Sequence, residues 1–217
     1  MGKRVGVLLS GCGVFDGAEI HEAVITLLTL DRAGAEIICI APDIKFDTIN
    51  HLKQEETGEK RSVLEESARI ARGEIRDIKD INASDLDALI MPGGLGAAKN
   101  LSDFAVKGPD ATVHPEVKRI LQEMSDAGKP IGAICIAPAT VVKALQDKNL
   151  EVTIGTDPGT ASVLESLGAK HKKCTVDEIC IDQKNKVVTT PAYMLGPGIK
   201  DVASGIEKLV NQIVSMS

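Results

Sequence analysis

The fold of this chain is decided by the stretch Lys129-Pro130-Ile131-Gly132-Ala133-Ile134-Cys135-Ile136-Ala137-Pro138-Ala139-Thr140. Residues 131–134 form a short apolar run that is typical of a buried parallel strand, and Pro138 suits the first turn of a following helix. Cys135 therefore lies at a sharp strand-to-helix turn, the arrangement of a nucleophile elbow. The small residues Ala133 and Ala137 leave room for such a turn. The alternative is a core thiol, because cysteine is often buried.

Short apolar runs and helical patterns alternate on both sides of this stretch. The predicted strands cover residues 5–9, 37–40, 86–91, 131–134 and 150–154, and the predicted helices cover residues 18–32, 62–72, 115–127, 138–146, 160–167 and 199–214. Polar residues 47–60 predict a loop, and residues 179–190 predict a small hairpin near the C-terminus. The alternation predicts an α/β fold with a doubly wound, mostly parallel sheet and helices on both faces. Because no linker or repeat interrupts it, we expect a single domain over residues 1–217.

In such a fold, active residues lie at the carboxyl ends of the strands. This rule places residues 10–17, 92–96 and 135–138 on one rim of the sheet. Gly93 and Gly94 end a strand, and glycines there leave backbone N–H groups free to act as an oxyanion hole, together with the N–H of Ile136. The alternative for the glycine pair is an ordinary strand-to-helix turn.

Glu22 lies about one turn inside the first predicted helix, close to the same rim. That helix carries Ile20, Ala23, Val24, Leu27 and Leu28 on one face. A carboxyl held among apolar residues would have a raised pKa and would exchange a proton with the thiol. The alternative is a solvated helix glutamate, and the sequence leaves both open.

Composition and spacing exclude several classes of function. The formal net charge is −6, and three Phe, one Tyr and no Trp leave little for stacking on bases, so we expect no nucleic-acid partner. Five scattered cysteines without a C-x-x-C pair favour reduced thiols. No group of residues has metal-ligand spacing, so we expect no metal. Gly11 and Gly13 begin a dinucleotide-binding fingerprint, but Asp16 occupies the position of the third glycine and Gly17 comes one residue too late, so we expect no cofactor. The first apolar run is too short for a membrane span, and without a presequence pattern we expect a cytoplasmic protein.

In the elbow, the glycine pair and the start of the first predicted helix, the chain resembles the ThiJ/PfpI superfamily. The resemblance rests on Pro92-Gly93-Gly94, on Asn100-Leu101, on residues 133–139, and on Gly17-Ala18-Glu19-Ile20-His21-Glu22, which looks similar to a helix-opening segment of that family. It implies a flavodoxin-like, class I glutamine amidotransferase-like fold. It also implies that the family's elbow cysteine is Cys135, its buried carboxylate is Glu22, and its oxyanion amides belong to Gly94 and Ile136.

A closer resemblance covers nearly the whole chain. The chain is similar to the enhancing-lycopene-biosynthesis protein family, also called isoprenoid biosynthesis proteins with an amidotransferase-like domain or sigma cross-reacting protein 27A. This similarity rests on residues 10–17, 49–52, 97–101 and 189–194. It implies a homodimer, and it implies that bacterial members lack a presequence whereas animal relatives are mitochondrial.

Departures from the superfamily pattern limit the chemistry. The only histidine after Cys135 is His171, which Lys172 and Lys173 follow, so a Cys-His-Glu triad for glutamine hydrolysis is unsupported. We therefore expect backbone dipoles and Glu22 to activate the thiol, with His21, Asp157 and Cys12 as auxiliary candidates.

Two functions remain in view. The first is a cofactor-independent glyoxalase that converts glyoxal, or a similar small α-oxoaldehyde, to glycolate or the matching hydroxy acid through a Cys135 hemithioacetal. The second is a non-catalytic or redox-sensing amidotransferase-like dimer that influences early isoprenoid biosynthesis. A thiol without a placed histidine favours addition to small aldehydes, or oxidation, over amide hydrolysis.

Overall fold

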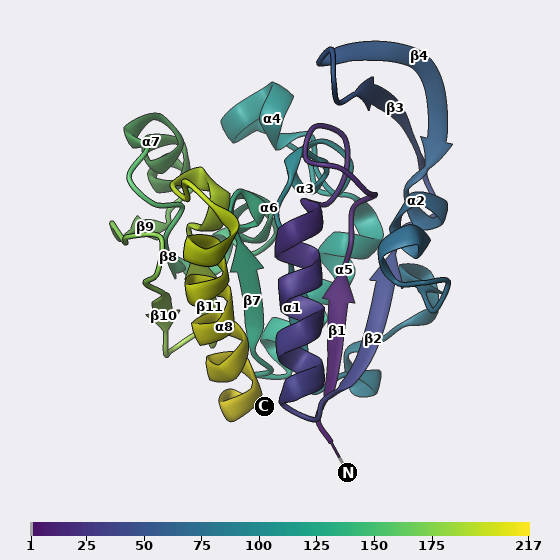
Figure 1. The fold of residues 1–217 in the computed structure, drawn as a ribbon. Coiled ribbons are helices and arrows are strands. Elements are labelled where there is room, and N and C mark those ends of the chain that lie inside the picture. Colours follow the sequence, from purple (N-terminus) through teal and green to yellow (C-terminus); the bar gives the residue numbers. More distant parts are fainter. Residues whose placement is uncertain (1) are drawn as a thin grey trace.

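The computed structural model describes residues 2–217 and is built around a seven-stranded sheet (Figure 1). The strand order is β10-β11-β7-β6-β1-β2-β5, and within the described part of this sheet only the β10–β11 pair is antiparallel. The strands are β1 (Arg4–Leu8), β2 (Glu36–Ala41), β5 (Arg76–Asp77), β6 (Ala88–Met91), β7 (Ile131–Ile134), β10 (Cys180–Asp182) and β11 (Val187–Thr190). The doubly wound, mostly parallel sheet and its C-terminal hairpin are thus confirmed.

Helices cover both faces of this sheet. One face carries α1 (Ile20–Arg32) and α8 (Ile199–Met216), which lie side by side, and α5 (Pro115–Asp126) and α6 (Ala137–Ala144) lie on the opposite face (Figure 1). The other helices are α2 (Val63–Ile70), α3 (Leu95–Lys99), α4 (Phe104–Lys107) and α7 (Pro158–Ser166). Single 3₁₀ turns cover Ile78–Asp80, Ala83–Asp85, Gly108–Asp110, Gln146–Lys148 and Ala192–Met194, of which the last is called η5.

Alternate residues of the central strands pack into two different cores. In β6, Ala88 and Ile90 face the layer of α1 and α8, whereas Leu89 and Met91 face the opposite layer. This period of two is what a strand buried on both faces requires. The buried sheet therefore gives a rigid rim at its carboxyl ends.

Two small sheets lie outside the central one. Strands β3 (Lys45–Asn50) and β4 (Glu55–Ser62) form an antiparallel hairpin, where the sequence predicted a loop. Strands β8 (Glu151–Val152) and β9 (Lys170–His171) pair with each other, so the predicted strand at 150–154 does not join the main sheet. Within residues 2–217, no helix combines the length and the apolar character needed to cross a membrane.

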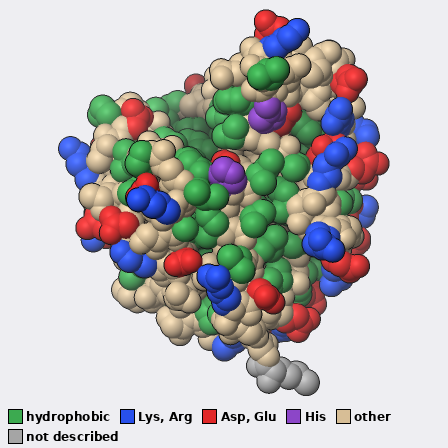
Figure 2. All heavy atoms as spheres, viewed as in Figure 1, with side chains coloured by type: hydrophobic (Ala, Val, Ile, Leu, Met, Phe, Trp, Pro, Cys, Tyr) green, Lys and Arg blue, Asp and Glu red, His purple; other side chains and the backbone are tan. Residues whose placement is uncertain are grey.

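Helix α1 turns its apolar stripe outward. Ile20, Val24 and Leu28 are each more than 40% exposed, whereas Glu22 and Thr26 lie on the buried side. The Thr26 hydroxyl is satisfied there because it donates to the carbonyl of Glu22 at 2.7 Å. Figure 2 shows apolar side chains gathered over the middle of this face of the molecule.

Candidate active site

Cys135 lies at a strained turn between β7 and α6. Its φ is +61°, in the left-handed region that a side chain rarely adopts, and its side chain is 8% exposed. Its N–H donates to the carbonyl of Thr190 on β11 at 2.9 Å, which fixes the turn to the sheet. Strain of this kind is retained at functional sites when the surroundings hold it in place.

Glu22 is fully buried on α1, at the same rim as Cys135. Its Oε2 accepts from the N–H of Gly93 at 2.8 Å, and its Oε1 accepts from the N–H of Tyr193 at 3.2 Å. The Glu19 side chain caps α1 by accepting from the N–H of Glu22 at 2.7 Å, and this cap fixes where the helix begins and hence where Glu22 lies. Both carboxyl oxygens are therefore oriented by backbone amides.

The Glu22 carboxyl and the Cys135 thiol are neighbours and alter each other's ionisation. Burial raises the pKa of Glu22 to about 8, against the lowering effect of the amides that it accepts from. Burial and the neighbouring carboxylate raise the pKa of Cys135, whereas the backbone N–H groups of Gly94 and Ile136 hydrogen-bond to the sulfur and lower it. The first proton released as pH rises thus belongs to the pair rather than to one atom.

Gly93 and Gly94 lie where a side chain has no room. A Cβ on Gly93 would lie 2.5 Å from the Cβ of Cys135 and 2.6 Å from the Glu22 carboxyl. Gly94 has a φ of +91°, and a Cβ there would lie 2.4 Å from the carbonyl oxygen of Gly17. The two glycines let the end of β6 approach the elbow closely enough for a backbone amide to reach the sulfur.

Tyr193, on η5, is a site residue to which the sequence reasoning assigned no role. Besides the amide bond to Glu22, its hydroxyl oxygen lies 2.7 Å from Nδ1 of His21, the residue before Glu22 on α1. The preceding Ala192 is buried and has a φ of +44°, a second strained position. The signal was present in part, because Tyr193 is the only tyrosine and belongs to the motif at 189–194.

The remaining predicted residues lie at different parts of the rim. Asp157 caps α7, accepting from the N–H of Thr160 at 2.7 Å, which helps to keep the pKa of its carboxyl low. With Ile136 it lines a pocket of about 450 Å³. Cys12 is half-buried, and burial followed by the Glu66 carboxylate raises the pKa of its thiol. His171 lies on β9, where Nε2 accepts from the N–H of Ile154 at 3.4 Å.

A doubly wound sheet with a strained cysteine elbow and a buried glutamate defines the class, and the chain belongs to the DJ-1/PfpI family, whose model matches residues 12–194. It is 48% identical to the human glutamine amidotransferase-like class 1 domain-containing protein 3, mitochondrial, over 99% of this chain and 83% of that protein. It is 47% identical to the rat ES1 protein homolog, mitochondrial, over 99% of this chain and 84% of that protein.

A solved structure agrees with this assignment over nearly the full length. The isoprenoid biosynthesis protein with amidotransferase-like domain from Ehrlichia chaffeensis superposes with a TM-score of 0.91 at 38% identity, covering 98% of this chain and 99% of that one. The family resemblance found in the sequence is thereby confirmed.

The predicted cytoplasmic location is wrong. It rested on the lack of a presequence pattern at the start of the chain, whereas the human and rat relatives are both named as mitochondrial proteins. Local composition was an insufficient signal for location.

Proposed function

We propose that this chain is a cofactor-independent glyoxalase that converts glyoxal, or a similar small α-oxoaldehyde, to the corresponding hydroxy acid. The observation that carries the proposal is the buried pair of Cys135 and Glu22, which meet at Gly93 and alter each other's ionisation, with the amides of Gly94 and Ile136 near the sulfur. A nucleophile and a proton carrier in one site are what an internal redox rearrangement of an aldehyde requires.

The proposed reaction begins with the Cys135 thiolate adding to one aldehyde carbon of glyoxal, which forms a C–S bond and a hemithioacetal. The Glu22 carboxylate then removes the proton from that carbon to give an enediol. Glu22 returns the proton to the neighbouring carbon, so one carbon is oxidised to a thioester as the other is reduced to an alcohol. Water cleaves the thioester, releasing glycolate and the free thiol. One glyoxal and one water thus account for all atoms of glycolate.

Backbone amides supply the electrostatic part of the proposed catalysis. The N–H groups of Gly94 and Ile136 are directed at the sulfur, so an oxygen on the carbon attached to that sulfur forms within their reach. In other enzymes the loss of one such donor costs about 3–4 kcal/mol of transition-state stabilisation. The strained backbone at Cys135 and Gly94 is consistent with this use.

The direct test is glycolate formation from glyoxal by the purified chain in the absence of glutathione. Cys135→Ser should lose at least about 10³-fold in kcat/KM, because the attacking thiolate is gone. Cys174→Ser is the matched control: Cys174 is also a buried free thiol, and this variant should retain the activity of the parent chain. Unchanged turnover in Cys135→Ser would exclude the mechanism.

A second function, a redox-sensing role, is favoured by a specific feature of the same site. The thiol is nearly enclosed and faces two amide donors and one carboxyl, groups that also suit the oxygens of a sulfenate or sulfinate. This role would connect the chain to isoprenoid supply, as the name of the Ehrlichia relative suggests. Peroxide treatment followed by intact-mass analysis should then add oxygen to the parent chain and not to Cys135→Ala. A Cys135 that stays unoxidised would exclude this role.

We include a homodimer in the proposal. The outward stripe of Ile20, Val24 and Leu28 on α1 adjoins an apolar pocket of about 490 Å³ that Leu27 and Ile37 also line. A contiguous apolar surface of this kind is typical of an interface. Leu28→Glu should shift the mass measured by light scattering from dimer to monomer. Leu52→Glu, at the 92% exposed Leu52 of the β3–β4 turn, is the control that should not.

A further inference from the structure

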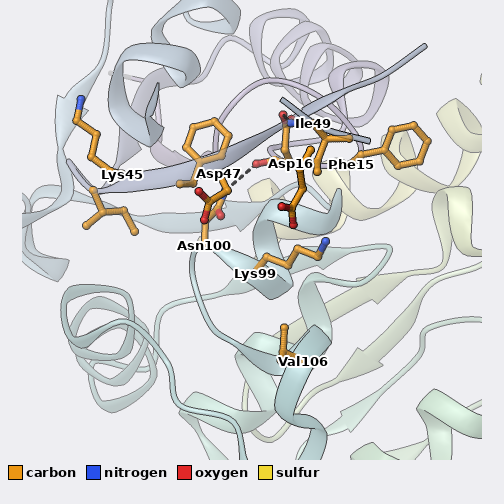
Figure 3. Close-up of a pocket in the computed structure, with 11 residues that line it drawn as sticks. Phe15, Asp16, Lys45, Asp47, Ile49, Lys99, Asn100 and Val106 are labelled. Atoms are coloured by element: carbon orange, nitrogen blue, oxygen red, sulfur yellow. Dashed lines mark hydrogen bonds between the residues drawn. The ribbon is translucent and has the colours of Figure 1, made fainter. Parts of the chain in front are cut away.

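A further pocket lies between the β3–β4 hairpin and the segment of α3 and α4. Its volume is about 350 Å³, and its walls come from the loop after β1, from both hairpin strands, and from α3 and α4 (Figure 3). Three motifs that distinguished this sequence, at residues 10–17, 49–52 and 97–101, all contribute to these walls. The proposed glyoxalase reaction uses no side chain from this pocket.

Asp16 in this wall has an unused hydrogen-bonding atom. Its side chain is 8% exposed, and its Oδ2 accepts from the N–H of Ile49 at 2.7 Å. Its Oδ1 is buried and has no hydrogen-bond partner within residues 2–217. His51 does not supply one, since its Nε2 lies 3.7 Å away and instead accepts from the N–H of Phe15 at 3.2 Å. A buried carboxylate oxygen without a donor is costly, so the site favours a ligand that brings one.

The loop that carries Asp16 is held rigidly at the pocket. Asn100, which also lines the pocket, donates from Nδ2 to the carbonyl oxygens of Ser10 at 2.9 Å and Asp16 at 2.8 Å. Figure 3 shows the Asn100 bond to the loop beside the cavity. A site whose polar groups are already oriented loses less entropy when it binds a ligand.

Charges of both signs remain available in the walls. Asp47 pairs with Lys60 at 3.0 Å, and Lys45 approaches Glu65 at 3.9 Å. In the described part of the chain, two lining residues, Glu56 and Lys99, form no ion pair. A ligand with a positive and a negative group would complement the carboxylates of Asp16 and Glu56 with the first and the Lys99 ammonium with the second.

The pocket also has an apolar part. Phe46 and Ile49 are among the apolar residues that line the cavity. Aromatic rings attract an ammonium group and exclude water from it. From the orphaned carboxylate oxygen of Asp16, the ammonium of Lys99 (unpaired within residues 2–217), the aromatic side chain of Phe46 and the small volume, we propose that this pocket binds a free α-amino acid.

The test measures binding of each standard L-amino acid, supplied alone at millimolar concentration, to the full chain by isothermal titration calorimetry. At least one should bind, and its analogues lacking either the amino group or the carboxyl group should bind about tenfold more weakly or worse. Binding that is as tight for the acid without its amino group would overturn the proposal in favour of a simple anion site. The absence of binding for every amino acid would overturn it as well.

Lys99→Glu locates the site. Lys99 is exposed, so the variant should fold, and it should weaken the binding of that amino acid at least about tenfold. Lys118→Glu, at an exposed lysine of α5 outside the pocket, is the matched control and should bind as the parent chain does. If both variants bound the amino acid equally weakly, or if neither bound it more weakly than the parent chain, the binding would lie elsewhere and the assignment would be overturned.

Discussion

Two buried thiols of this chain differ in everything except burial. Cys39 lies within β2 and is 7% exposed, and Cys135 lies just after β7 and is 8% exposed. Burial alone raises the pKa of Cys39 to about 11. Around Cys135, by contrast, a carboxyl shares the proton and two amides stabilise the thiolate.

Backbone conformation, rather than concealment from water, accounts for the different surroundings of the two thiols. Cys39 has the extended backbone of a strand paired with β1, so its neighbours' N–H groups are used in the sheet ladder. The left-handed turn at Cys135 ends the ladder and leaves the amides of Gly94 and Ile136 for the sulfur. The carboxyl comes from α1, whose N-terminal end meets the same rim.

The largest expected effect separates proton transfer from thiol activation. Glu22→Gln should lower kcat with glyoxal about 10²- to 10⁴-fold, because an amide cannot carry the proton between the two substrate carbons. Alkylation of Cys135 by iodoacetamide should persist, since the amide can still donate to the sulfur. Glu19→Gln is the control: it keeps an oxygen to cap α1 and should remain active. Equal loss in the two variants would contradict this division.

The second effect is the pH dependence of the two thiols. Since the pKa of Glu22 is raised to about 8, the pair holds its protons below that pH and releases the first one above it. Labelling of Cys135 by iodoacetamide should therefore rise about tenfold per pH unit below about pH 8 and more slowly above it, because the ionised Glu22 carboxylate opposes a negative charge on the sulfur. Labelling of Cys39 should continue to rise towards about pH 11. Parallel profiles, read by peptide mass spectrometry, would remove the distinction.

The third effect concerns stability, for which substitution of Cys39 should have a larger effect than substitution of Cys135. Cys39→Ser places a hydroxyl in an apolar cluster and should lower the free energy of unfolding by about 1–3 kcal/mol. Cys135→Ser should cost less than about 1 kcal/mol, because two amides and a carboxyl can bond the hydroxyl. Urea denaturation of both variants measures the difference. A larger cost at Cys135 would show that its polar partners do not compensate the burial.

The smallest effect tests how η5 positions Glu22. Tyr193→Phe removes the hydrogen bond to His21 and should lower turnover about two- to fivefold. The pH midpoint of activity should move upward, because the N–H of residue 193 would then bond the Glu22 carboxylate less firmly. His21→Ala should have the same effect, and the double variant should lose no more than either single one. Additive losses would mean that the two residues act separately.

Much of the fold could be predicted from short-range patterns. Apolar runs and turn residues predict the buried strands and the C-terminal hairpin. The β3–β4 hairpin was missed because residues 55–61 of β4 are all exposed and show no alternation, while the backbone ladder and the buried Phe46 hold the pair together. The apolar face of α1 was found, but the pattern does not say whether such a face packs inward or outward.

The elbow at Cys135 follows from local sequence alone. Its strand, its proline and its small flanking residues act within a few positions, so local chemistry suffices to place Cys135. By contrast, the burial of Glu22, its hydrogen bond from the N–H of Tyr193, and the pocket shared by Asp16 and Lys99 depend on how distant segments pack together. Glu22 and Gly93 are 71 positions apart in the sequence, and Glu22 and Tyr193 are 171 positions apart. Contacts across such separations depend on how the layers pack, and no local pattern records that.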